Sequence, residues 1–200
     1  MTGDNPHDKL FQKTFSAPEN ARGMLRSLLP QGLVEAVDWS TLELQDGHFV
    51  DEALRGSQSD LLYSVRWDDK QVFLYLLFEH QSSAEPLMPL RMLRYMVRIW
   101  ERWLAEQTDT PKQIPAIVPI VLSHADGGWR QAVAMHELFD PRVAEAAGKH
   151  LPEYRFVLED LALKSDDDLM ARAGTAMAIL TTLLLRNVRS ADDLKARMAG

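Results

Sequence analysis

The chain has 200 residues, a hydrophobic fraction of 46%, a formal net charge of −7 and no cysteine. This is enough apolar material for one well-cored domain, and the lack of cysteine excludes disulfides, thiolate zinc sites and cysteine nucleophiles. The first residues do not show the basic and apolar order of a signal peptide, and no apolar run reaches the roughly 18 residues of a membrane span, so we expect a cytoplasmic protein. The acidic net charge argues against a general nucleic-acid surface, so contact with phosphates would need a local basic patch.

Helices are predicted at the start of the chain. Asp8 is a candidate N-cap for a short helix that ends at Phe15. Ser16–Glu19 has the spacing of a capping box, with a proline in the first turn of a helix that ends near Leu29. Residues 33–49 then predict one or two short extended pieces and a turn.

A β-hairpin is predicted over Ser59–Gln81. Val72–Phe78 is an unbroken apolar run, which indicates a strand buried on both faces. Leu61–Val65 is the partner strand, and the polar residues 68–71 supply the turn.

The rest of the chain predicts helices, with two further strands among them. The predicted segments are a helix from Pro89 to about Glu106, a strand at Ala116–Leu122 with Pro119 at an edge or irregularity, a helix at Trp129–Phe139 after two glycines, irregular or weakly helical chain at Asp140–Leu151, a strand at Tyr154–Leu158, a helix at Asp166–Arg186 and a frayed helix at Asp192–Met198. This order predicts an α/β fold, a mixed central sheet flanked by helices. We divide it into a core domain, residues 1–165, and a C-terminal helical extension, residues 166–200.

The hairpin brings two carboxylates together. If it closes around Asp69-Lys70, Asp60 lies directly opposite Glu79, and Gln81 points the same way. Two facing carboxylates at the end of a buried hairpin repel each other unless a cation lies between them, and a metal ion is the natural candidate. A three-residue loop would instead pair Asp60 with Phe78 and turn Glu79 to the other face, and strand-end acids are also common without any function.

The helix at 90–104 carries a stripe of arginines. At about 100° per residue they fall within an arc of about 80°, with Tyr95 at its edge. The arginines are Arg91, Arg94, Arg98 and Arg102. The residues expected to face the sheet are Leu93, Met96, Val97, Trp100, Trp103 and Leu104. Arginine forks suit phosphate oxygens, and the helix follows directly from the strand of Glu79 and Gln81; the other explanation is a solvated face paired with Glu101 or Glu106.

Several blocks together resemble one family, and they run in order from Pro6 to about Trp129. They are Pro6–Phe11, Phe49–Asp51, Ser59–Leu61, Phe78–Ser82, Arg91–Tyr95 and Val118-Pro119. These blocks are similar to those of the Rpn family of recombination-promoting nucleases, also described as transposases, within the PD-(D/E)xK nuclease superfamily. The resemblance implies a restriction-endonuclease-like core that cuts DNA with a divalent metal, usually Mg²⁺.

Carried over by position, the resemblance assigns Asp60 and Glu79 as metal-binding carboxylates, with the carbonyl of His80 as a third ligand. Gln81 stands where most of the superfamily has a lysine. Glutamine cannot act as a general base, so we expect it to orient the attacking water. Tyr95 and the arginine stripe would contact DNA.

Other residues are secondary candidates. His7, Asp8 and Asp51 would be accessory groups, and His124 could approach from a neighbouring strand, although each has an ordinary structural explanation. Two further functions stay open beside the nuclease: a degenerate module that kept the fold to bind DNA or protein, and an adaptor that forms a homodimer through its C-terminal helices.

Overall fold

A computed structural model describes residues 6–45, 59–79, 85–125 and 127–188. In chain order its helices and strands are α1 (Pro6–Phe15), α2 (Pro18–Leu28), α3 (Gln31–Ala36), β1 (Asp38–Leu44), β2 (Ser59–Trp67), β3 (Lys70–Glu79), α4 (Met88–Ala105), β4 (Ala116–Ser123), α5 (Pro141–Ala147), β5 (Val157–Asp160), α6 (Asp166–Met170) and α7 (Ala176–Asn187). Short 3₁₀ turns lie at Met135–Leu138, Gly148–His150 and Leu161–Leu163.

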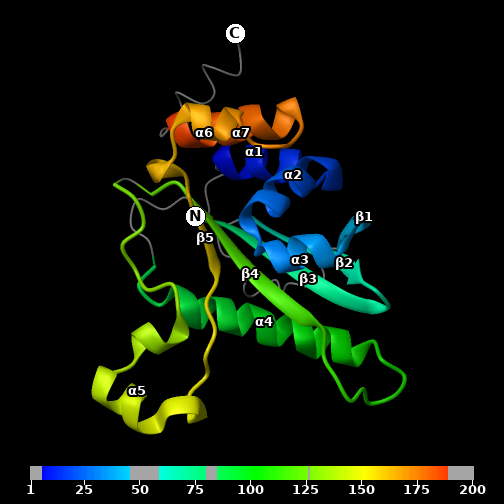
Figure 1. The fold of residues 1–200 in the computed structure, drawn as a ribbon, viewed down its shortest axis with the longest axis vertical. Coiled ribbons are helices and arrows are strands. Elements are labelled where there is room, and N and C mark those ends of the chain that lie inside the picture. The colour runs from blue at the N-terminus through cyan, green and yellow to red at the C-terminus, as the bar shows by residue number, and fades with distance from the viewer. Residues whose placement is uncertain (1–5, 46–58, 80–84, 126, 189–200) are drawn as a thin grey trace.

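Within the described residues, the strands form one five-stranded sheet in the order β1-β2-β3-β4-β5 (Figure 1). β1, β2 and β3 are antiparallel neighbours, whereas β3, β4 and β5 run parallel. This mixed sheet between helices confirms the predicted α/β class. Pro119 lies in the half of β4 that precedes its pairing with β5, so its missing N–H fits the expected edge position.

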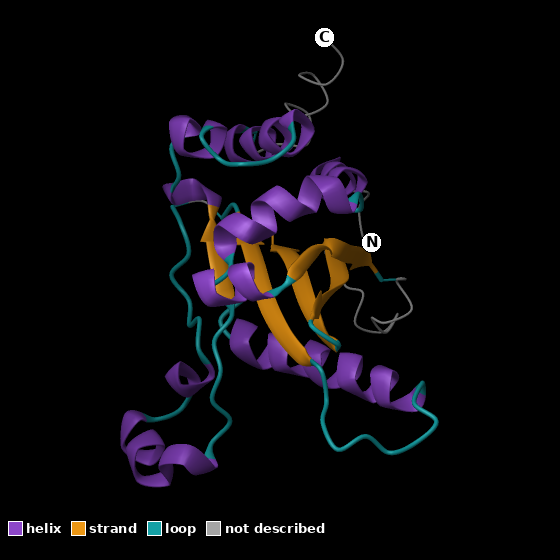
Figure 2. Cartoon of the chain, turned by 45° about the vertical axis from the view of Figure 1, so that its right-hand side comes forward, coloured by secondary structure: helices purple, strands orange, loops and turns teal. Residues whose placement is uncertain are grey.

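Helices cover both faces of the sheet (Figure 2). The face that we call the α1 face packs under α1 and α2, and α7 lies against these two helices; the core on this side includes Phe11, Tyr63 and Phe78. The opposite face, the α4 face, packs under α4 and includes Tyr75 and Met92. Residues 72–78 of β3 alternate between the two faces and are all buried, which confirms the prediction of a strand covered on both sides.

The hairpin turn lies one residue earlier than predicted. Trp67 pairs with Lys70, so the turn is Asp68-Asp69, with φ of 54° at Asp68, a conformation that aspartate tolerates. Asp60 therefore pairs with Leu77 and not with Glu79. The register differs from the prediction by two residues, and a shift of two leaves every residue on its predicted face.

The predicted helix starts near the N-terminus are wrong. α1 begins at Pro6, so Asp8 lies in the first turn and is not the N-cap. The N-cap of α2 is Ala17, and no side chain caps it, so Ser16 does not form a capping box. Pro18 does occupy the first turn of α2, as expected. A short helix, α3, also forms where an extended piece was predicted.

The helix predicted at 129–139 is absent. Gly127 and Gly128 have φ of 76° and 82°, and the Trp129 N–H donates to Asp160 Oδ2 at 2.6 Å. Left-handed glycines and this anchor hold the segment extended, and only the 3₁₀ turn at 135–138 follows.

The predicted helix at 166–186 is two helices, because residues 171–175 interrupt it and Thr175 caps α7. α7 packs on α1 and α2, and Leu185 is buried in the same apolar cluster as Phe11. The domain division at 165 and the homodimer stay predictions, and residues 192–198 lie outside the described part. Within that part, no helix combines the length and apolar composition of a membrane span.

Candidate functional site

The carboxyl ends of three parallel strands meet at one edge of the sheet. β3 ends at Glu79, paired in register with Ser123 of β4, and Ser123 pairs in turn with Asp160 of β5. Asp60 lies at this edge because β2 runs antiparallel to β3 and begins there. In open α/β sheets, ligands bind outside the carboxyl ends of the strands, so this edge is the first place to look for a site.

Asp60 is held from the α4 face by a buried tyrosine. The Tyr75 hydroxyl donates to Asp60 Oδ2 at 3.1 Å, and Tyr75 is fully buried. Burial raises the pKa of Tyr75 well above its ordinary value, and the negative charge of Asp60 raises it further. Tyr75 therefore remains a neutral phenol, which acts as the donor to the carboxylate.

The contact continues into α4. The Tyr75 and Tyr95 rings lie 5.3 Å apart between centroids, and Arg91 donates from Nε and Nη2 to the Tyr95 hydroxyl, each at 3.2 Å. Arg91 Nη1 also pairs with Glu85 Oε2 at 2.9 Å. We call Asp60, Tyr75, Tyr95 and Arg91 the tyrosine network. It joins the predicted metal ligand on β2 to one arginine of α4.

The second predicted metal ligand is described only by its backbone. Position 79 follows Tyr75 and Leu77 in the alternation of β3, so it belongs to the face that carries Asp60. The Glu79 side chain lies outside the described residues, as do His80, Gln81 and Asp51. Within the described part, no group of three or more acidic, histidine or cysteine side chains could hold a metal. The proposed ligand set is not tested by this, because two of its three members lie outside that part.

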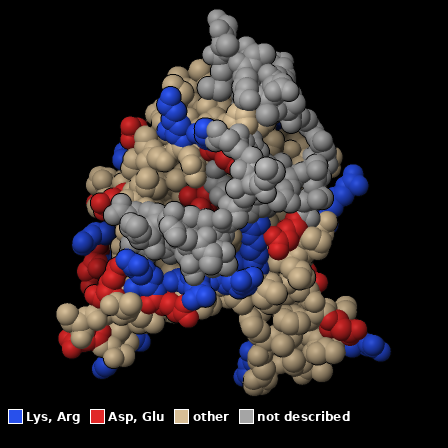
Figure 3. Space-filling view, turned by 180° about the vertical axis from the view of Figure 1, so that it is seen from behind, with Lys and Arg blue, Asp and Glu red and all other residues tan. Residues whose placement is uncertain are grey.

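The arginine stripe is less uniform than predicted. Arg98 pairs with Glu101 at 3.2 Å and Arg102 with Glu106 at 2.9 Å, and both arginines are about half exposed. Arg91 is 14% exposed and reaches the tyrosine network. Figure 3 shows basic side chains in a row across this side of the molecule, with acidic side chains beside them. The pairing with Glu101 and Glu106, one of the two predicted explanations, is confirmed.

The prediction of which α4 residues face the sheet is partly wrong. Its buried residues are Met88, Pro89, Met92, Tyr95, Met96 and Ile99. Val97 and Leu104 were expected to face the sheet and are 40% and 41% exposed. The buried stripe is rotated by about 90° from the predicted one, so the arginines flank it instead of lying opposite. Tyr95 therefore belongs to the core, where it contacts Tyr75.

Two histidines meet on the other face of the same edge. His7 is buried, its ring lies 5.4 Å from that of His124, and its Nε2 is 2.8 Å from the Val188 carbonyl oxygen. His124 stacks on Phe78, which belongs to the α1 face. His124 thus reaches the edge as predicted, but it packs with His7 on the face opposite Asp60. Asp8 follows His7 in the first turn of α1.

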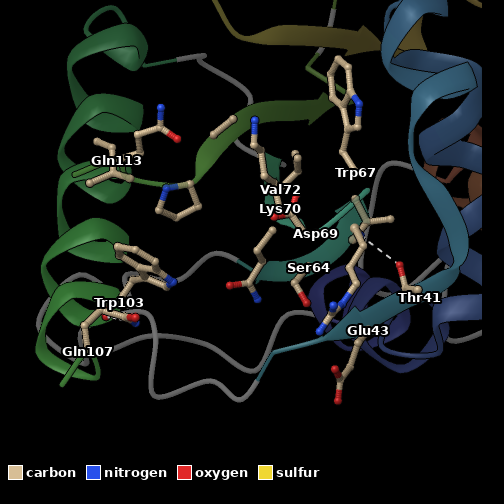
Figure 4. Close-up of a pocket in the computed structure, with 16 residues that line it drawn as sticks. Thr41, Glu43, Ser64, Trp67, Asp69, Lys70, Val72, Trp103, Gln107 and Gln113 are labelled. Carbon is tan, nitrogen blue, oxygen red and sulfur yellow. Dashed lines mark hydrogen bonds between the residues drawn. The ribbon is translucent and has the colours of Figure 1, made fainter. Parts of the chain in front are cut away.

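A large cavity lies at the opposite end of the sheet (Figure 4). Its volume is about 710 Å³, and Figure 4 shows Trp103 of α4 and Gln107, which follows that helix, on one side and Thr41 and Glu43 of β1 on the other. Two basic residues, Arg66 and Lys70, and two acidic residues, Glu43 and Asp69, line it. No member of the tyrosine network lines the cavity, so it is separate from the candidate site, and its formal charges cancel.

Tyr75 is the functional candidate that the sequence interpretation missed. It stands in the middle of an apolar run, where an aromatic residue indicates simple packing. The available signal was its position: Tyr75 shares the alternation of Glu79, so a correct hairpin places it on the face of Asp60.

The fold and the carboxyl-edge site thus define a mixed α/β protein with an acidic residue of β2 facing the helix that follows β3. The chain belongs to a family: residues 5–199 match the one described as "Putative transposase, YhgA-like". No solved structure matches the chain.

Curated relatives extend over nearly the whole chain. This chain is 29% identical over 195 residues to the recombination-promoting nuclease RpnD of Escherichia coli O157:H7. The match covers 96% of this chain and 71% of RpnD. The chain is 31% identical over 189 residues to the recombination-promoting nuclease RpnA of Escherichia coli K12, covering 94% of this chain and 61% of RpnA. The inactive recombination-promoting nuclease-like protein RpnE of the same strain is 30% identical, over 96% of this chain and 61% of RpnE. The chain therefore spans about 60–70% of the length of these relatives.

Proposed function

We propose that the chain is a metal-dependent DNA endonuclease of the PD-(D/E)xK type that acts in recombination or in mobile-element processes. The observation that carries this proposal is the placement of Asp60 and strand position 79 on one face at the carboxyl edge of the sheet. The mixed sheet between helices and the relatives named as recombination-promoting nucleases support it.

The residues have distinct roles in this proposal. The carboxylates of Asp60 and Glu79 and the carbonyl of His80 offer oxygen ligands, which is the donor chemistry that Mg²⁺ prefers. When bound there, Mg²⁺ would activate water and neutralise the scissile phosphate. Gln81 would orient the attacking water through its side-chain amide, because it has no basic group to remove a proton.

DNA would be held by α4. Arg91 is connected to Asp60 through Tyr95 and Tyr75. Among the arginines of α4, it is therefore the one that would contact a phosphate near the cut. Arg94, Arg98 and Arg102 continue along the exposed side of the helix. Arg98 and Arg102 would exchange exposed glutamate partners for phosphates, an exchange that costs little because surface ion pairs are weak.

Plasmid nicking tests the proposal. We expect the purified chain to nick supercoiled DNA in Mg²⁺ and not in EDTA, and Asp60→Asn to remove the activity without changing the thermal unfolding temperature by more than a few degrees. Equal nicking by Asp60→Asn would assign the activity to a contaminant and exclude this site. Arg142→Ala, a change of an exposed arginine on α5, is the matched control.

A catalytically inactive binding module is the second candidate. It is favoured by RpnE and by a relative of 37% identity over half of this chain that is named "Putative inactive recombination-promoting nuclease-like protein YjiP". This function predicts DNA binding that persists in EDTA and is unchanged by Asp60→Asn. Loss of binding in EDTA would exclude it.

A further inference from the structure

Two tyrosines are fully buried on the neighbouring strands β2 and β3, and they have different partners. The Tyr63 hydroxyl donates to the backbone carbonyl of Phe15 at the end of α1. The Tyr75 hydroxyl donates to the carboxylate of Asp60, at 3.1 Å. A backbone carbonyl is fixed by its helix, whereas a carboxylate on a side chain can rotate. A buried tyrosine hydroxyl therefore holds the end of a helix at Tyr63, whereas at Tyr75 it orients a charged side chain.

We propose that Tyr75 is a positioning residue for metal binding: its hydroxyl holds Oδ2 of Asp60 and so sets the direction in which this carboxylate meets the metal. The inference rests on the proposed function, because it assigns Tyr75 to the same metal site. Groups behind a metal ligand orient it, and their loss typically weakens metal binding by about 10- to 100-fold.

The surroundings of Tyr75 suit this role. Its ring is packed between Tyr95 and the apolar residues of the α4 face, so the hydroxyl position is fixed by burial. Within the described residues, Asp60 is the hydrogen-bond partner of this hydroxyl. Arg91 binds the Tyr95 hydroxyl, and Tyr95 touches Tyr75 through its ring. A change at Tyr95 would therefore disturb the arginine and leave the Tyr75 hydrogen bond in place.

The test is Mn²⁺ binding by calorimetry to the full chain and to three variants that each lose one hydroxyl. We expect Tyr75→Phe to weaken Mn²⁺ binding by at least about 10-fold. Tyr63→Phe, the matched control on the other face, should leave the affinity within about twofold, although both variants lose a buried hydrogen bond and should melt at similarly lowered temperatures. Tyr95→Phe should leave Mn²⁺ affinity unchanged and raise KM for DNA.

Unchanged Mn²⁺ affinity in Tyr75→Phe, with a wild-type chain that binds the metal, overturns the role of Tyr75 and leaves the nuclease proposal standing. A wild-type chain that binds no Mn²⁺ overturns both. Fluorotyrosine labelling gives a second readout: the chain has four tyrosines, and the Tyr→Phe variants assign their ¹⁹F signals. We expect the ¹⁹F signal of Tyr75 to shift on addition of Mg²⁺ and that of Tyr63 to stay; a Tyr75 signal that does not respond contradicts the proposal.

Discussion

The two faces of the sheet bury similar residue types and differ in the polar groups that their tyrosines hold. On the α1 face, the Phe11 ring stacks on Phe78 and meets Phe15 at a tilt, and the buried hydroxyl of Tyr63 donates to a backbone carbonyl. On the α4 face, Tyr75 and Tyr95 lead to a carboxylate and a guanidinium at the carboxyl edge. Burial alone therefore does not distinguish these two tyrosines; the partner of the hydroxyl does, since it is a backbone carbonyl for Tyr63 and a carboxylate for Tyr75.

The α1 face also joins the two ends of the described chain. Thr14 of α1 and Thr181 of α7 share a hydrogen bond of 2.9 Å between hydroxyls, and His7 contacts the carbonyl of Val188. The N-terminal helix is thus bound to the C-terminal helix over the same core cluster. This face fastens the fold, while the α4 face leaves charged groups at its margin.

Truncation of Phe11 should have the largest effect on stability. Phe11 is fully buried, and its ring stacks on Phe78 at 4.9 Å between centroids. We expect Phe11→Ala to lower the free energy of unfolding by about 3–5 kcal/mol, measured by urea denaturation. Leu163→Ala, at a residue that is 74% exposed, is the control and should change it by less than about 0.5 kcal/mol. A loss below about 1 kcal/mol for Phe11→Ala would mean that α1 does not close this face.

The central hairpin was predictable from the sequence because its signals are local. A seven-residue apolar run, a polar turn and strand alternation were enough to place Asp60 and position 79 on one face, even with the turn displaced by one residue. The side of α4 that packs on the sheet was not predictable, since Val97 and Met92 are both apolar and the choice between them depends on packing against residues of several strands. The break at 171–175 depends on a contact with α2 that is about 150 residues away in the chain.

That contact leads to a second prediction, which sets intrinsic propensity against packing. A Cβ at Gly23 of α2 would lie 2.3 Å from the Ala173 carbonyl oxygen and 2.6 Å from the Gly174 Cα, both backbone atoms that cannot move aside cheaply. Alanine favours helix over glycine by about 1 kcal/mol, but overpacking typically costs about 1–3 kcal/mol. We expect Gly23→Ala to be destabilising by about 1–2 kcal/mol in urea denaturation.

Gly32→Ala is the matched control, because no atom lies within 4 Å of a Cβ at that position in α3. This change should be neutral or stabilising by up to about 1 kcal/mol. Stabilisation by both alanines would show that α2 and the link at 171–175 do not approach each other as described.

The difference in the free energy of unfolding between wild type and Tyr63→Phe should depend on pH in the alkaline range. Burial raises the pKa of the Tyr63 hydroxyl above its ordinary value, so the folded state keeps the phenol neutral. The stability that depends on this group is fully present below the unfolded pKa of about 10, and it falls by about 1.4 kcal/mol per pH unit above it. Tyr63→Phe should be less stable than wild type by about 1 kcal/mol at pH 8, and the two should become equal near pH 11. Parallel losses from pH 8 to pH 11 would contradict the burial of a titratable hydroxyl here.

The smallest effect on stability is expected at the exposed margin of the α4 face, where a large effect on DNA binding is expected instead. Arg94 is exposed, and it makes no ion pair with any described residue, so Arg94→Ala should change the free energy of unfolding by less than about 0.5 kcal/mol. If Arg94 contacts a phosphate, log K for DNA binding should fall less steeply with log salt in the variant. The slope should become less negative by about 0.9 for duplex DNA, measured by fluorescence anisotropy in Ca²⁺. Arg142→Ala removes the same charge from α5, where the side chain is 93% exposed, and should leave the slope unchanged. Equal slopes for both variants would show that net charge, and not the arginine stripe, governs DNA binding. A change of slope in Arg94→Ala alone would show that the margin of the α4 face contacts DNA, which would separate it from the purely structural α1 face.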